Sequence, residues 1–313
     1  MTIQIGLALS GGGAKGIAHV GVLKVLEEAQ ISVSMLAGTS MGGVVSALYA
    51  TGRSVDEIEQ LFRSLRPLDV VQRDRTGLGL LGQDKIASRL REVLGGDLTF
   101  DQLNLPLALV AADLETGEEV VIREGSVVEG ILATTALPIV FAPSQWQGRL
   151  LVDGAVVNPV PFDVVRQMGA DRVIAVHTRS VIPSLREIES VPRNRRGEPL
   201  LRSLLSRSRW TPLVHIIERS IGIMGHTLVE QRMRETPPDL MIEVLLNGVG
   251  LFDFDLMDQC LTAGEEVARQ HMPELITLRD TPLPNRWMRW WRDLRQRLPE
   301  VKNWRLLSKQ DVP

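Results

Sequence analysis

The chain has 313 residues, 44% of them hydrophobic, and a formal net charge of −3, so it is long enough to bury a substantial core. The slightly acidic balance gives no basis for a nucleic-acid partner, and a single cysteine, Cys260, excludes an internal disulfide. The absence of a signal-peptide pattern and of an uncharged apolar run long enough to cross a membrane predicts a cytoplasmic protein.

Strand-like and helix-like segments alternate along the first half of the chain. Strands are predicted at 3–9, 31–38, 172–177 and, on either side of a turn, within 105–122. Helices are predicted at 14–29, 42–50, 54–66, 83–94 and 160–168. Alternation of this kind predicts an α/β fold, in which helices cover the faces of a sheet.

The composition changes near residue 183, where a segment rich in Arg, Ser and Pro begins. Residues 183–210 are predicted to form a basic insertion, for which a solvated loop and a lid or membrane contact are the two interpretations. A helix over 212–234, a strand within 237–246 and a helix over 255–271 are expected to follow.

The first motif is SGGGAKG at 10–16, which matches G-x-G-x-x-G through Gly11, Gly13 and Gly16. It follows a predicted strand and opens a helix, where backbone amides face either a pyrophosphate or the oxyanion of an acyl-transfer intermediate. A dinucleotide site expects an acidic residue about 20 positions further on, at the end of the second strand. That strand ends in LAGTS, without a carboxylate, so the acyl-transfer interpretation is favoured.

The second motif is GTSMG at 38–42, which matches G-x-S-x-G with Ser40 between Gly38 and Gly42. A strand, a sharp turn and a helix in this order predict a nucleophile elbow, whereas the simpler alternative makes Ser40 a helix N-cap. Both glycine motifs follow neighbouring strands at their carboxyl ends, so we expect them to face one crevice.

A serine nucleophile needs a base, and two residues are candidates. His177 ends a predicted strand and would suit a Ser-Asp-His triad, while His19 lies within the first helix and is expected to be packed. Asp153 ends a strand-like run just before Gly154 and Ala155. An Asp-Gly pair commonly forms a turn, but a carboxylate at a strand end can also reach a neighbouring crevice.

Together, GGGAKG, GTSMG and DGA, in this order, resemble the patatin-like phospholipase family, in particular its bacterial members. ATTALPIVFAP at 133–143 and LFDFDLMDQCLTAGEEVA at 251–268 are also similar to that family, so the resemblance spans residues 3–275. It implies a three-layer α/β/α fold with a mainly parallel central sheet, formed by a domain over 1–275.

The resemblance also implies the roles of individual residues. Ser40 would be the nucleophile and Asp153 its proton acceptor, with no histidine required. The oxyanion hole would come from the amides of Gly11, Gly12 and Gly13. The chain departs from the family at Lys15, where arginine is frequent, and at Ala155, where a second glycine is more common. Lysine keeps the charge but loses the planar fork of arginine.

The activity implied by this resemblance is that of a serine acyl hydrolase cleaving fatty acyl esters of phospholipids, as a phospholipase A or lysophospholipase does. No cofactor is implied, and no metal-binding motif is found, so no metal is expected. The alternatives are an esterase or thioesterase with a Ser40–His177 triad, a non-catalytic regulatory protein on the same scaffold, and a nucleotide-binding domain.

Residues 276–313 form a basic, tryptophan-rich C-terminal extension. A helix over 285–298 would carry one apolar stripe made of Trp287, Trp290, Trp291, Leu294 and Leu298. Arginines opposite such a stripe suit an interfacial helix on anionic lipid, which would place residues 285–305 at the inner membrane surface. The alternative is a helix docked on the protein itself or on a second subunit.

Overall fold

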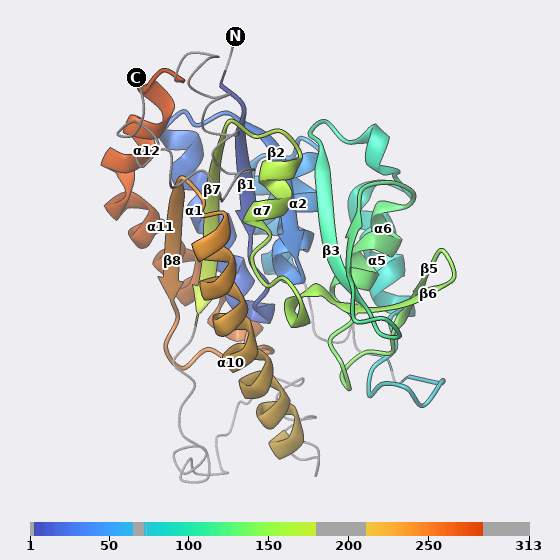
Figure 1. Ribbon diagram of the computed structural model, residues 1–313. Coiled ribbons are helices and arrows are strands. Elements are labelled where there is room, and N and C mark those ends of the chain that lie inside the picture. The colour runs from blue at the N-terminus through green and yellow to red at the C-terminus, as the bar shows by residue number, and fades with distance from the viewer. Residues whose placement is uncertain (1–2, 65–71, 73, 180–210, 284–313) are drawn as a thin grey trace, which may run out of the picture. The chain divides into compact units, whose positions relative to one another are not determined.

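The computed structural model describes residues 3–64, 72, 74–179 and 211–283 of the chain (Figure 1). Residues Thr2–Arg279 form one compact unit, and the chain from Asp280 onward belongs to a separate unit. Residues 183–210, predicted as a basic insertion, and residues 285–305, for which membrane contact is one interpretation, lie outside the described residues. No helix among the described residues is long and apolar enough to span a membrane.

The described residues form an eight-stranded sheet with the order β5-β6-β3-β2-β1-β7-β8, and β4 pairs with β3. The strands are β1 Ile5–Leu9, β2 Val33–Thr39, β3 Leu107–Asp113, β4 Glu119–Ile122, β5 Ser144–Trp146, β6 Arg149–Asp153, β7 Arg172–Arg179 and β8 Leu240–Leu245. Strands β3, β2, β1, β7 and β8 run parallel, whereas β4, β5 and β6 form the antiparallel part. The mainly parallel sheet predicted from the sequence is confirmed.

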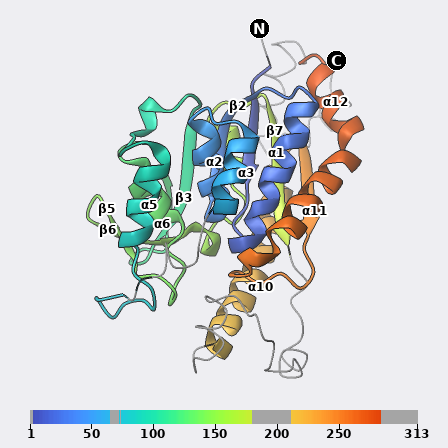
Figure 2. The same ribbon diagram turned by 180° about the vertical axis from the view of Figure 1, so that it is seen from behind.

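Helices cover both faces of this sheet, which confirms the three-layer α/β/α fold (Figures 1 and 2). One face carries α1 Ala18–Glu28, α2 Met41–Ala50, α3 Val55–Ser64, α5 Asp84–Leu94, α6 Val127–Thr134 and α11 Met257–Gln270. The other face carries α7 Phe162–Gln167 and α10 Thr211–Glu235. Helix α12 Met272–Asp280 follows α11.

Side chains of different size line the two faces of the sheet. Because successive strand residues point to opposite faces, Leu7 and Leu9 join the larger core under α1 and α2. On the face that carries α7, four adjacent strands each contribute an alanine: Ala8, Ala37, Ala108 and Ala175. At Gly6 a Cβ atom would lie only 2.0 Å from Cγ1 of Val165. The small residues therefore let α7 pack directly on the strands.

Three elements were not expected from the sequence. Helix α6 is a short apolar run, but the hydroxyl of Ser126 accepts a hydrogen bond from the amide of Glu129, a capping pattern that is readable in the sequence. Strand β5 has only three residues and depends on its pairing with β6. The predicted final helix over 255–271 is followed by a further helix, α12, after a break at His271.

Gly6→Ala is expected to destabilise the protein by about 1–3 kcal/mol, because the new methyl group would overlap Val165 in a closely packed layer. Chemical denaturation followed by circular dichroism measures this change in the free energy of unfolding. The matched control is Gly225→Ala in α10, whose Cβ would meet Pro159 at an ordinary 3.6 Å. That control should keep or gain stability, and equal losses in both variants would contradict the packing argument.

Candidate active site

Strand β3 brings two distant parts of the sequence together. Its first half pairs with β2, up to Thr39 opposite Val110, and its second half pairs with β6, from Asp153 opposite Ala111 onward. Strand β4 pairs with residues 109–112 of β3. Because β4 takes one side of β3, β2 and β6 follow one another along the other side. The end of β2 therefore lies next to the end of β6.

The turn after β2 holds Ser40 in a sharp conformation, with φ 53° and ψ −127°. A residue other than glycine in this region stores about 1–3 kcal/mol of strain, which is typical of functional sites. The turn is tight: a Cβ atom on Gly42 would lie 2.3 Å from the carbonyl oxygen of Leu9, and one on Gly38 would lie 2.5 Å from Cα of Gly43. The Ser40 side chain makes no cap hydrogen bond to α2, so the N-cap interpretation is not supported.

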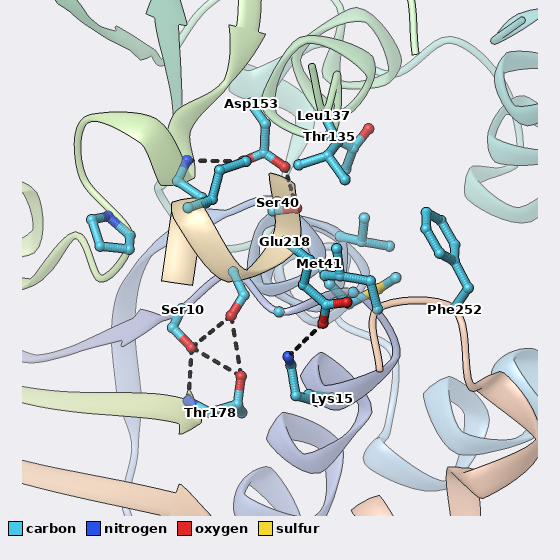
Figure 3. Close-up of a pocket in the computed structure, with 18 of the residues that line it drawn as sticks. Ser10, Lys15, Ser40, Met41, Thr135, Leu137, Asp153, Thr178, Glu218 and Phe252 are labelled. Atoms are coloured by element: carbon cyan, nitrogen blue, oxygen red, sulfur yellow. Dashed lines mark hydrogen bonds and ion pairs between the residues drawn. The ribbon is translucent and has the colours of Figure 1, made fainter. Parts of the chain in front are cut away.

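The side chains of Ser40 and Asp153 are hydrogen-bonded to each other (Figure 3). Oγ of Ser40 donates to Oδ2 of Asp153 at 2.6 Å, and the amide of Ala155 donates to Oδ1 at 2.8 Å. Asp153 is only 2% exposed. Burial raises the pKa of this carboxyl to about 6, although the two hydrogen bonds act in the opposite direction.

The glycine loop after β1 lies beside Ser40. A Cβ atom on Gly11 would lie 3.2 Å from Cβ of Ser40. The amide of Gly11 donates to the carbonyl of Pro159 at 3.1 Å, so it is occupied in this structure. Within the described part of the chain, the amides of Gly12 and Gly13 have no hydrogen-bond acceptor. Of the three predicted oxyanion donors, Gly12 and Gly13 thus remain available.

The other residues of the glycine motif have structural contacts. Gly16 lets the loop pack against α2, because a Cβ atom there would lie 2.4 Å from Cγ of Met41. Nζ of Lys15 lies 3.4 Å from Oε1 of Glu218 in α10, and both side chains are buried (Figure 3). Gly154 fits under β3, since its Cβ would lie 2.2 Å from the carbonyl oxygen of Val110.

Neither His177, the candidate base, nor His19 is hydrogen-bonded to Ser40. Nδ1 of His177 lies 3.9 Å from Oε1 of Glu243 on the neighbouring strand β8. Nε2 of His19 lies 2.8 Å from the carbonyl oxygen of Ser10, and complete burial lowers its pKa to about 4. His19 is therefore neutral near pH 7 and packed, as expected from its place in the first helix. His177 does line the same cavity as Ser40.

Ser40 and Asp153 line a cavity of about 840 Å³. Part of its wall is apolar and comes from helices α2, α3, α5 and α6, which contribute Val44, Leu48, Phe62, Leu90 and Ile131. Phe141, in the loop after α6, adds to this wall. Helix α10 contributes residues from the other side of the sheet, including Glu218. No group of three or more His, Cys, Asp or Glu residues in the described ranges is placed to hold a metal ion. The cavity suits a largely apolar ligand placed against a serine.

Sequence reasoning missed the residues that support this pair. The hydroxyl of Thr134 accepts the amide of Ser40 at 2.9 Å and donates to the carbonyl of Val110. The buried Asn158 and Pro159 accept hydrogen bonds through their carbonyls. Thr134 lies in the 133–143 stretch that resembles the patatin-like family, but nothing in the sequence indicates which group it contacts.

Asp153→Asn is expected to change the pH dependence of stability. The folded pKa of Asp153, about 6, exceeds the ordinary value of 3.8, so the native state binds this proton more tightly than the unfolded chain. The stability of the wild type should fall as pH rises from about 4 to about 6 and stay lower above that. Relative to the wild type, the variant should gain up to about 3 kcal/mol between pH 3 and pH 8. Urea denaturation across this range measures the difference.

Asp74→Asn is a control, because its effect on stability at high pH should be opposite to that of Asp153→Asn. Hydrogen bonds to the Asp74 carboxylate, first from the hydroxyl of Thr76, lower its pKa to about 2. This carboxylate stabilises the protein above its ordinary pKa and loses that contribution as pH falls. The variant should therefore be less stable than the wild type at pH 8. If the free energies of unfolding of Asp153→Asn and the wild type changed with pH in parallel, the desolvation of Asp153 would be contradicted.

The chain is similar to proteins of one family. The family model "Patatin-like phospholipase" matches residues 7–166. An uncharacterized NTE family protein of Mycobacterium tuberculosis is 36% identical over 176 residues, which cover 55% of this chain and 48% of that protein. The mouse protein patatin-like phospholipase domain-containing protein 6 is 34% identical over 187 residues, covering 56% of this chain and 14% of that protein.

A solved structure supports the fold. The crystal structure of VipD from Legionella pneumophila superposes with a TM-score of 0.58 at 14% sequence identity, covering 87% of this chain and 67% of that one. The chain spans about half the length of the mycobacterial relatives it matches. Since the family model covers half of the chain, including the glycine loop, the serine elbow and Asp153, the chain belongs to the patatin-like phospholipase family.

Proposed function

We propose that this protein is a serine acyl hydrolase that cleaves fatty acyl esters of phospholipids or lysophospholipids through Ser40 and Asp153. The observation that carries the proposal is the 2.6 Å hydrogen bond from Oγ of Ser40 to the buried carboxylate of Asp153, in the wall of a cavity with an apolar lining. A nucleophile and a base within hydrogen-bond reach form the minimal unit for covalent acyl transfer.

In the acylation step, Oγ of Ser40 attacks the ester carbonyl carbon while Oδ2 of Asp153 accepts the hydroxyl proton. The C–O bond to the alcohol breaks, and the departing alkoxide takes that proton back from Asp153. Water then attacks the acyl-enzyme, with Asp153 as its base, and releases the fatty acid and free Ser40. An ordinary carboxylate is a weak base for a hydroxyl, so the raised pKa of Asp153 brings it closer to what the reaction requires.

The oxyanion that forms during both steps is assigned to the amides of Gly12 and Gly13. These two amides have no acceptor among the described residues, and the preceding Gly11 lies beside Ser40. A preorganised donor of this kind contributes about 3 kcal/mol to the transition state. Gly11 itself serves a different purpose, because its amide holds the carbonyl of Pro159.

The apolar wall formed from α2, α3, α5 and α6 is proposed to hold the acyl chain. The volume of the whole cavity, about 840 Å³, lies within the usual range for small-molecule sites, about 300–1,000 Å³. A long-chain ester lies in a bilayer or micelle, so contact with a membrane surface is part of the proposal. The segment proposed for this contact, 285–305, lies outside the described residues.

Ser40 and Asp153 are expected to determine how fast the protein is labelled by a fluorophosphonate probe, which reacts with activated serines. Ser40→Ala should abolish labelling, and Asp153→Asn should slow it by about 10²–10⁴-fold, the usual contribution of a general base. His177→Ala should label at nearly the wild-type rate, because His177 contacts Glu243 rather than Ser40. In-gel fluorescence over a time course measures these rates.

A matched control for Asp153→Asn is Asp113→Asn, which changes another buried aspartate at a strand end. Asp113 holds a turn, accepting the amides of Glu115 and Thr116 at 2.9 and 3.1 Å. Its variant should label like the wild type. Labelling that persists in Ser40→Ala would overturn the proposal, and collapse in His177→Ala alone would favour an esterase or thioesterase with a Ser40–His177 triad.

The hydrolysis rate of a soluble p-nitrophenyl ester is expected to rise with pH and to reach half of its maximum near pH 6. The reason is that Asp153 accepts a proton only when ionised, and burial raises its pKa to about 6. Initial rates between pH 4 and pH 8 measure this dependence on pH. The same rise of the rate with pH should be seen in His177→Ala. Its loss in that variant would mean that His177, and not Asp153, is the titrating group.

A further inference from the structure

The loop that follows Asp153 contacts each of the other catalytic parts. The carbonyl of Asn158 accepts the hydroxyl of Thr39, the residue before Ser40, at 2.8 Å. The next carbonyl, of Pro159, accepts the amide of Gly11 in the glycine loop at 3.1 Å. One short segment, residues 154–160, thus connects the aspartate, the serine elbow and the glycine loop.

The side chain of Asn158 holds this segment from within. It is completely buried, and Nδ2 donates to Oε1 of Glu119 at 3.1 Å and to Oδ1 of Asp163 at 2.9 Å. These two carboxylates come from β4 and α7, which are separate parts of the scaffold. Because both acceptors are carboxylates, the amide nitrogen and not the oxygen must face them.

Arg232 of α10 completes the network. Its guanidinium donates to Oε2 of Glu119 at 2.6 Å, to Oδ2 of Asp163 and to the carbonyl of Val157 at 3.4 Å. The side chains of Arg232, Glu119 and Asp163 are 24%, 21% and 17% exposed, so the charges are well shielded from water. Two carboxylates that share one amide would repel each other, and the fork of the guanidinium bridges both and the loop backbone.

We infer that Asn158 and Arg232 are positioning residues, which hold the 154–160 segment so that Asp153, Ser40 and the glycine loop keep their mutual geometry. This inference rests on the proposed hydrolase function and extends it to residues that touch neither the serine nor the substrate. It also gives α10 a second role, because this helix lines the cavity through Glu218 and anchors the aspartate loop through Arg232.

Arg232→Met in the full chain tests the inference. The fluorophosphonate labelling rate should fall by between about tenfold and a hundredfold, because small displacements of reacting groups cost rate. With the p-nitrophenyl ester, kcat should fall while KM changes little, since the variant leaves the apolar wall intact. Arg232→Lys should restore part of the rate, because it keeps the charge but loses the fork. If Arg232→Met does not fold, Arg232→Lys carries the same test with a smaller effect.

Arg166→Met is the matched control. Arg166 pairs with Asp239 at 2.7 Å and donates to the carbonyls of Asp171 and Pro237, and its side chain is 29% exposed. It makes the same kinds of contact as Arg232, but none with the 154–160 segment. It should lose a similar amount of thermal stability yet label within about twofold of the wild type.

Asn158→Ala should slow labelling as Arg232→Met does, and the double variant should be little worse than the slower single one, since both residues hold one loop. Wild-type labelling in folded Arg232→Met would overturn this inference, as would equal rate losses in Arg232→Met and Arg166→Met. Labelling of Ser40→Ala at the wild-type rate would instead overturn the proposed function. Slow labelling confined to Asn158→Ala and the Arg232 variants, with kcat lowered at constant KM, would support the inference.

Discussion

The candidate site depends on one constraint in the sheet, the change of neighbour along one side of β3. Strand β2 ends at Thr39, and β6 pairs with the next residues of β3. The last residue of β6, Asp153, is the one that lies nearest to the end of β2. Two strands that end head to head leave their terminal side chains side by side. The 2.6 Å contact between Ser40 and Asp153 follows from this register, although 112 residues separate them in the sequence.

Burial gives the aspartate its chemical character at a cost to the fold. Excluding water from Asp153 raises its pKa to about 6, because the ionised form is less favourable in the native state. In the proposed reaction, this shift makes Asp153 a better base. The strained backbone of Ser40 is a second local cost. Both are tolerated because the surrounding sheet is densely packed, with small residues under α7 and larger ones under α1 and α2.

Backbone hydrogen bonds connect the loops of this site. The amide of Gly11 donates to the carbonyl of Pro159, so the loop after β1 is tied to the loop after β6. Among the described residues, the amides of Gly12 and Gly13 have no acceptor. Asn158 and Arg232 then fix that second loop to β4, α7 and α10. Asn158 and Arg232 lie outside the three motifs read from the sequence, whereas Ser40, Asp153 and the glycine loop lie within them.

The sequence by itself determined the fold class, most of the strands and helices, and the two motif residues Ser40 and Asp153, because periodicity, glycine spacing and motif order are local properties. It left open whether His177 or Asp153 serves as the base, since a base is defined by contact rather than by position along the chain. Only the tertiary structure decided that Ser40 is hydrogen-bonded to Asp153 and that the amide of Gly11 donates to Pro159. It also decided which groups Thr134, Asn158 and Arg232 contact. Such contacts join residues far apart in the chain, and their partners are set by strand register and helix packing, which no local pattern records.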